Sequence, residues 1–214
     1  MNKYISTFLL AVCAGLCIGL GGCVFLALLT VNKFLGAVLF TVGLFTICTN
    51  EFNLFTGKAC YIFDNKPSYL IDLLIIWIGN LCGTALMSLF VFLTRLGRSF
   101  YENANSLVLV KQNDSLLSLF FLGVICNILI FIAVDGYKNN PHELGKYLAL
   151  LFGVTVFILT GTEHSIADMF YFCVAGKMFT ADGFLRIAII SLGNVVGGLI
   201  LPTIKKVSTK LIKE

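Results

Sequence analysis

The stretch Thr160-Gly161-Thr162-Glu163-His164-Ser165 decides the fold, because it interrupts an apolar run from Tyr147 to Met178 with polar residues and a glycine. The run is too long for one straight span, since a membrane helix needs about 20 apolar residues. A second apolar run, Phe34 to Phe63, carries a similar interruption, Glu51-Phe52-Asn53-Leu54-Phe55-Thr56-Gly57-Lys58. Backbone that leaves a helix at membrane depth must be buried in protein or line a cavity.

These interruptions predict two broken membrane helices, with the breaks at Asn53–Gly57 and Thr160–Ser165. A pair of interrupted segments at corresponding places in two halves of a chain is a good pointer to a transport site.

The composition also indicates a membrane protein. Of 214 residues, 58% are hydrophobic and 12% charged, and the mean hydropathy of +0.96 leaves too little polar surface to cover a soluble globule. The net charge of +4 is spread along the chain, which argues against nucleic-acid binding. With eight cysteines, no CxxC motif and two histidines, we expect no metal site and no cofactor.

Charged residues divide the chain into six apolar segments, because a charge in lipid is costly. We expect an all-α integral membrane protein with six transmembrane helices over residues 6–29, 34–63, 73–94, 115–134, 147–178 and 187–204, which form one domain over residues 1–214. The first segment is longer than a signal-peptide core, so we expect it to stay uncleaved. With the N-terminus inside, nine of the 15 Lys and Arg residues lie on the inner side, which predicts a multi-pass protein of the cell membrane with both termini cytoplasmic.

A short motif occurs once in each half of the chain. Gly79-Asn80-Leu81-Cys82-Gly83 lies in segment three and Gly193-Asn194-Val195-Val196-Gly197 in segment six, 114 residues later. Glycines four residues apart allow helices to approach closely. With three helices in each half, the second half must run upside down, so we predict a 3+3 inverted repeat of about residues 6–94 and about residues 115–204.

At these residues the chain resembles the formate/nitrite transporters. Thr162-Glu163-His164-Ser165-Ile166-Ala167-Asp168-Met169-Phe170 is similar to the family pattern Glu-His-Ser-Ile-Ala-Asn-Met-Phe, with Asp168 in place of the usual Asn. Leu54-Phe55-Thr56-Gly57 is similar to the family's Leu-Phe-Thr-Gly loop, and Lys111 precedes Asn127 at the family's separation of sixteen residues. The resemblance implies an aquaporin-like fold, assembled as a homo-pentamer in which each protomer has its own pore.

The resemblance also implies roles for polar residues. His164 is expected to line the pore and titrates near neutral pH, and Thr56 is expected to face it from the opposite loop, with loop capping as the alternative. Lys111 is implied to attract anions in an outer vestibule. Asn127 is expected near the path, with a helix-to-helix hydrogen bond as the alternative.

The same resemblance implies two apolar constrictions around the histidine, formed by Phe40, Leu44, Leu54, Phe55 and Phe157. The intramembrane carboxylates Glu51 and Glu163 are expected to brace the broken helices by accepting bonds from loop N–H groups. Asp168 lies four residues after His164, and pairing with Lys177 and tuning of the histidine both stay open.

Together these features predict a channel for small monovalent anions of weak acids, or their conjugate acids, in a lipid bilayer. Formate is the first substrate, with nitrite or hydrosulfide as the alternative. A membrane enzyme with Glu163 and His164 as acid and base is disfavoured, because adjacent residues on a helix face different directions. A neutral-solute pore would be expected to carry paired Asn-Pro-Ala loops, which the sequence lacks.

Overall fold

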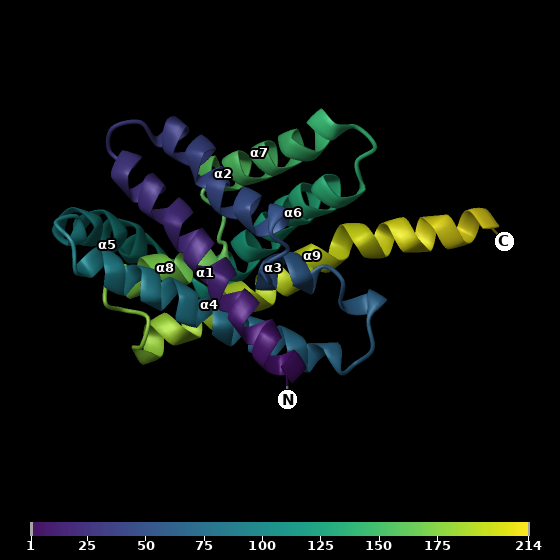
Figure 1. Ribbon diagram of the computed structural model, residues 1–214, viewed down its shortest axis with the longest axis horizontal. Helices are drawn as coiled ribbons and strands as arrows, with labels where there is room; N and C mark the ends of the chain where they lie inside the picture. The colour runs from purple at the N-terminus through teal and green to yellow at the C-terminus, as the bar shows by residue number, and fades with distance from the viewer. Residues whose placement is uncertain (1, 214) are drawn as a thin grey trace.

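The computed structural model describes residues 2–213, and it is helical throughout (Figure 1). In chain order the elements are α1 (Asn2–Leu28), α2 (Lys33–Thr49), α3 (Phe55–Ala59), the short 3₁₀ helix η1 (Ile62–Asp64), α4 (Tyr69–Phe92), α5 (Gly97–Asn113), α6 (Leu116–Asn139), α7 (Glu143–Leu159), α8 (Ser165–Val174) and α9 (Ala181–Lys213). Among the described residues, α1, α4, α6 and α9 are long and apolar enough to cross a membrane. The pairs α2–α3 and α7–α8 are the two broken helices, so the chain is a multi-pass membrane protein.

The helices form two equivalent sets. In the first, α1 packs on α2 and α4; in the second, α6 packs on α7 and α9. The sets meet where α2 packs on α7 and α4 on α8, and the short helices α3 and α8 lie toward the middle of the molecule (Figure 1). This is the predicted 3+3 inverted repeat, with α5 as the link between its halves.

Glycines at matching places let the long helices of each set approach closely. A Cβ on Gly83 of α4 would lie 2.2 Å from the carbonyl oxygen of Val12 on α1, and one on Gly197 of α9 would lie 2.0 Å from that of Val124 on α6. No side chain fits in such a space, so both crossings require glycine. The repeated Gly-Asn motif therefore has the same packing role in both halves.

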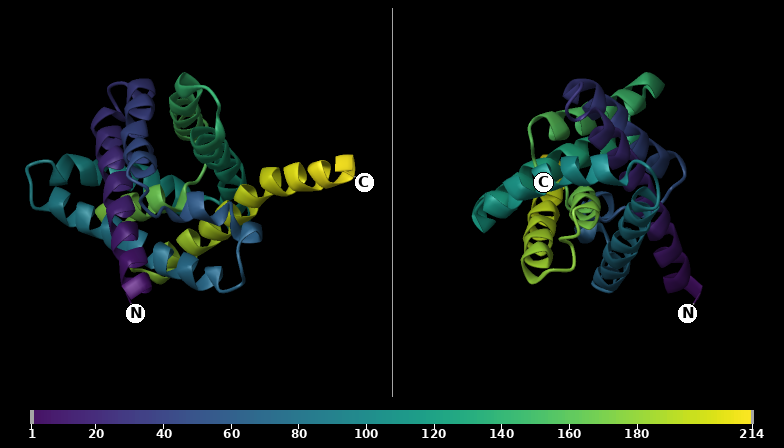
Figure 2. Two further views of the ribbon diagram at one scale, coloured as in Figure 1. Left: turned by 45° about the vertical axis from the view of Figure 1, so that its right-hand side comes forward. Right: turned by 90° about the vertical axis from the view of Figure 1, so that its left-hand side faces the viewer.

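Three features differ from the sequence prediction. Helix α5 was not predicted, because its polar composition does not resemble a membrane span; its buried side chains are Phe100, Ala104 and Val108. The first break covers residues 50–54 instead of Asn53–Gly57, and the second covers residues 160–164, with Ser165 the first residue of α8. Helix α9 continues beyond residue 204, and its C-terminal part projects past the other helices (Figure 2).

Ion pairs join several helix ends at one end of the molecule. Lys3 at the start of α1 lies 2.8 Å from Asp72 at the start of α4. Near the other terminus, Lys206 of α9 pairs with Asp64 of η1. One terminus is thus tied to the start of α4 and the other to η1 just before it, which places both on the same side of the bundle.

Candidate functional site

Two buried asparagines hold the N-termini of the short helices. The Asn80 Oδ1 atom accepts a hydrogen bond from the Phe55 N–H at 2.9 Å, and its Nδ2 donates to the carbonyl oxygens of Ala11 and Asn53. In the second half, the Asn194 Oδ1 accepts from the Ser165 N–H at 2.9 Å, and its Nδ2 donates to the carbonyl oxygens of Gly123 and Glu163. Each amide thus bonds one N–H and one carbonyl oxygen at the break, which no regular helix satisfies, and ties them to a carbonyl oxygen of a long helix.

The second residues of the two breaks also correspond. Glu51 has a φ of 57° and Gly161 a φ of 68°, so the backbone adopts the left-handed conformation at both breaks. A glutamate is uncommon there and the conformation is strained, whereas glycine adopts it freely. The predicted bracing role of Glu51 is wrong: its side chain is exposed, and among the described residues it accepts no hydrogen bond from the loop.

Thr56 and His164 meet between the two breaks, as predicted. Thr56 Oγ1 lies 2.9 Å from His164 Nε2, and both residues are buried. His164 is the N-cap of α8, where its Nδ1 accepts a hydrogen bond from the Ala167 N–H at 3.1 Å. A backbone N–H can only donate, so Nδ1 carries no proton, and a neutral His164 has its hydrogen on Nε2. Thr56 Oγ1 then accepts this bond, which leaves its own hydroxyl proton free to donate elsewhere.

Aromatic and aliphatic side chains surround this pair. The Phe157 ring is stacked on the His164 ring with centroids 5.4 Å apart, and Phe40 meets Phe157 edge-on at 5.9 Å. The remaining predicted constriction residues, Leu44, Leu54 and Phe55, are also buried. Apolar groups thus lie close to the central polar contact, while their role as constrictions stays a prediction.

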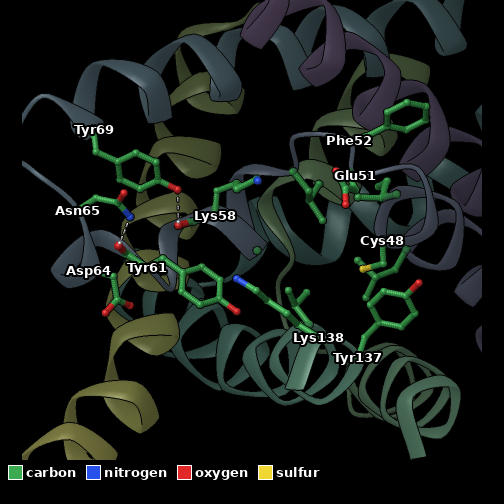
Figure 3. A pocket seen from close by; sticks show the side chains of 15 residues that line it. Cys48, Glu51, Phe52, Lys58, Tyr61, Asp64, Asn65, Tyr69, Tyr137 and Lys138 are labelled. Carbon is green, nitrogen blue, oxygen red and sulfur yellow. Dashed lines mark hydrogen bonds between the residues drawn. The ribbon is translucent and has the colours of Figure 1, made fainter. Parts of the chain in front are cut away.

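A cavity of about 760 Å³ opens beside the first break (Figure 3). Leu44, Leu54 and Gly57 belong to its wall, so it reaches the residue next to Thr56. The charged side chains in its lining are those of Glu51, Lys58, Asp64 and Lys138. Asp64 is already paired with Lys206, and Lys138 lies over the Tyr61 ring at 5.1 Å. With Asp64 neutralised by Lys206, the lysines Lys58 and Lys138 exceed Glu51 by one positive charge.

Asn127 makes the helix-to-helix bonds that the sequence analysis left as an alternative. It is fully buried, and its Nδ2 donates to the Asn194 carbonyl oxygen at 2.7 Å and to the Thr56 carbonyl oxygen at 3.1 Å. These bonds join α6 to α9 and to α3. Asn127 therefore helps to position Thr56.

Lys111 does not lie in an open vestibule, which corrects the role implied by the resemblance. Its side chain is 12% exposed and forms ion pairs with Glu163 and, at 2.9 Å, with Asp168. Glu163 thus braces its loop through Lys111 instead of through loop N–H groups, while its own N–H donates to the Leu122 carbonyl oxygen. Asp168 pairs with Lys111 and not with Lys177, which was one of its two open possibilities.

Sequence reasoning missed four residues that shape the site. The amides of Asn80 and Asn194 stand inside the repeated motif, whose glycines alone had been interpreted. For Lys58 and Lys138 the sequence indicated only the side of the membrane on which they lie. The cavity that they share forms only in the folded chain. Within residues 2–213, no group of three or more His, Cys, Asp or Glu side chains is placed to bind a metal ion.

The sequence profile of the formate/nitrite transporter family matches residues 2–207. The chain belongs to the formate/nitrite transporter family. It is 25% identical to the formate channel FocB of Escherichia coli over 92% of this chain and 84% of that protein. It is 28% identical to the nitrite transporter NirC of Salmonella typhimurium over 58% of this chain and 49% of that protein.

Solved structures support the same fold. A pentameric formate channel with formate bound superposes with a TM-score of 0.80 at 24% identity, over 98% of both chains. A channel described as an FNT family ion channel superposes with a TM-score of 0.82 at 23% identity, over 93% of this chain and 88% of that one. The fold is therefore the aquaporin-like fold of this family, whose members are transporters and not enzymes.

We expect Asn194→Ala to destabilise the protein more than the matched surface change Asn139→Ala. The first substitution removes the partners of the Ser165 N–H and the Glu163 carbonyl oxygen, and each buried polar group left without a partner costs about 1–3 kcal/mol. The Asn139 side chain donates only to Asp135, on the exposed side of α6. Thermal unfolding in detergent measures the difference, and equal melting temperatures for the two variants would refute the role of Asn194.

Proposed function

We propose that the chain forms a channel for small monovalent anions of weak acids, with formate as the first substrate and nitrite or hydrosulfide as the alternative. The observation that carries this proposal is the buried contact between Thr56 and His164, which joins the two broken helices. The Thr56 hydroxyl and the His164 imidazole are the polar groups that lie between the apolar side chains described above. The family membership and the substrates named for FocB and NirC support the same class of solute.

The proposed path begins in the cavity beside the first break, where Lys58 and Lys138 attract the anion (Figure 3). Beyond it, Leu44 and Leu54 form an apolar passage in which a bare anion is costly. Burial favours the neutral form of an acid, so the conjugate acid becomes the form that passes. Thr56 then donates its free hydroxyl proton as a hydrogen bond to the solute.

His164 takes part in this scheme as a neutral donor. For His164 to give up a proton to the solute it would first have to be an imidazolium, with a proton on Nδ1. That proton would face the Ala167 N–H, which now donates to Nδ1 at 3.1 Å. Charging the ring also opposes the positive end of the α8 dipole. The proton on the solute therefore comes from water in the cavity or from another group.

We also propose that the chain assembles as a homo-pentamer with one pore in each protomer, as a single channel domain with both termini in the cytoplasm. The similar solved structure is that of a pentameric formate channel, and this chain exposes many apolar side chains; both support the assembly. Native mass spectrometry should give a mass of five times 23.4 kDa. A stable monomer or dimer would contradict the assembly.

Flux into liposomes tests the solute class and the role of Thr56. We expect purified protein to pass formate, nitrite or hydrosulfide and not glycerol. Thr56→Val keeps the shape and removes the donor, so it should reduce formate flux about 2- to 10-fold, the equivalent of one net hydrogen bond. Thr84→Val is the matched control, because Thr84 is equally buried and bonds only its own helix, through Leu81. Glycerol flux, or equal losses in both variants, would contradict the proposal.

A second flux experiment tests the cavity as the anion entrance. Replacement of Lys58 and Lys138 by Gln should slow anion uptake from that side at low salt, and the difference should shrink at high salt as the attraction is screened. Lys33→Gln is the control, since Lys33 is exposed at the opposite end of the bundle, where α2 begins. If the double variant matches Lys33→Gln at low salt, the anions enter elsewhere.

A further inference from the structure

The cluster of Lys111, Glu163 and Asp168 contains more negative than positive charge. Lys111 forms ion pairs with both carboxylates, and the exposed fractions of the three side chains are 12%, 6% and 3%. With every group ionised the cluster would carry one net negative charge away from water. An uncompensated buried charge costs several kcal/mol, so such groups neutralise when they can.

One other cation lies near Lys111: Arg186 of α9 donates to the Lys111 carbonyl oxygen at 2.7 Å, and its own charge is paired with Asp182 at 2.8 Å. Thiols and a phenol also lie near the cluster, and they are neutral at pH 7 in their ordinary form: Cys126 on α6, Tyr171 on α8 and, beyond Tyr171, Cys23 on α1. His164 is next to Glu163 and caps α8 in its neutral form. Among the described residues, Lys111 alone forms ion pairs with the two carboxylates.

The hydrogen-bond geometry also requires a proton. Asp168 Oδ1 faces Lys111 at 2.9 Å, while its Oδ2 is buried and has no donor among the described residues. Both carboxyls contact the same Lys111 ammonium group, which places them side by side. Two ionised carboxylates are both acceptors only, so they can share a hydrogen bond only when one of them is protonated.

We propose that Glu163 and Asp168 hold one proton between them at neutral pH, which makes this cluster a proton-binding site next to the transport site. In the proton-loaded state the cluster is neutral and Lys111 is fully used within it. When the proton leaves, one negative charge remains beside His164. That charge opposes an anion at Thr56, so the site couples the protonation of the channel to anion passage. This coupling rests on the proposed function, whereas the proton-binding site itself does not.

Infrared spectroscopy of the full-length protein in liposomes tests the site without any transported solute. A protonated buried carboxyl gives a C=O stretch above the amide band that shifts in D₂O. We expect this band in the wild type at pH 7 and its loss in both Asp168→Asn and Glu163→Gln, because either change leaves one carboxylate balanced by Lys111. Asp72→Asn is the control, since Asp72 pairs with the exposed Lys3 and its removal should leave the band unchanged.

The wild-type spectrum alone can overturn the proposal, even if a variant fails to fold. Absence of the band at pH 7 means that both carboxyls are ionised. A band that survives either single substitution means that the proton is not shared by this pair. Either result leaves the flux experiments on Thr56 standing, while absent flux with the band present would reject the proposed function and keep the proton site.

Discussion

The architecture depends on one constraint: each break in a membrane helix exposes backbone N–H and C=O groups where no water can bond them. Asn80 and Asn194 meet this constraint in the same way, each with one accepted and two donated hydrogen bonds. Because each asparagine stands between two glycines that allow close helix contact, one short motif fixes both the packing of the long helices and the position of the break. The two short helices then begin at defined places near the middle of the molecule.

The contact between Thr56 and His164 forms where the two halves stop being equivalent. The N-cap of α3 is Leu54, whereas the N-cap of α8 is His164. The second residue of α3 is Thr56, whereas α8 has Ile166 there. One half thus contributes the hydroxyl and the other the imidazole, and the inverted arrangement brings them to 2.9 Å. The cluster of Lys111, Glu163 and Asp168 lies beside α8 and not beside α3, because α5, which carries Lys111, packs against α8.

The sequence was sufficient for the membrane class, the two breaks and the Thr56–His164 contact, since these follow from apolar length, polar interruptions and a motif. It was insufficient for α5, whose polar helix gives no membrane signal. It also misplaced Lys111, because the motif spacing does not reveal that Asp168 and Glu163 approach the same ammonium group. The first break was displaced because Asn80, 25 residues away, starts α3 at Phe55. Long-range hydrogen bonds and ion pairs decided each of these points.

The central claim is that His164 serves as a neutral N-cap with its proton on Nε2, so that protons are held elsewhere. Nitrogen NMR of ¹⁵N-histidine-labelled protein in liposomes tests this most directly, because the chain has only two histidines and His142→Gln removes the other one. At pH 7 the account predicts an unprotonated Nδ1 and a protonated Nε2 for His164. A ring with both nitrogens protonated, or with the proton on Nδ1, would contradict it.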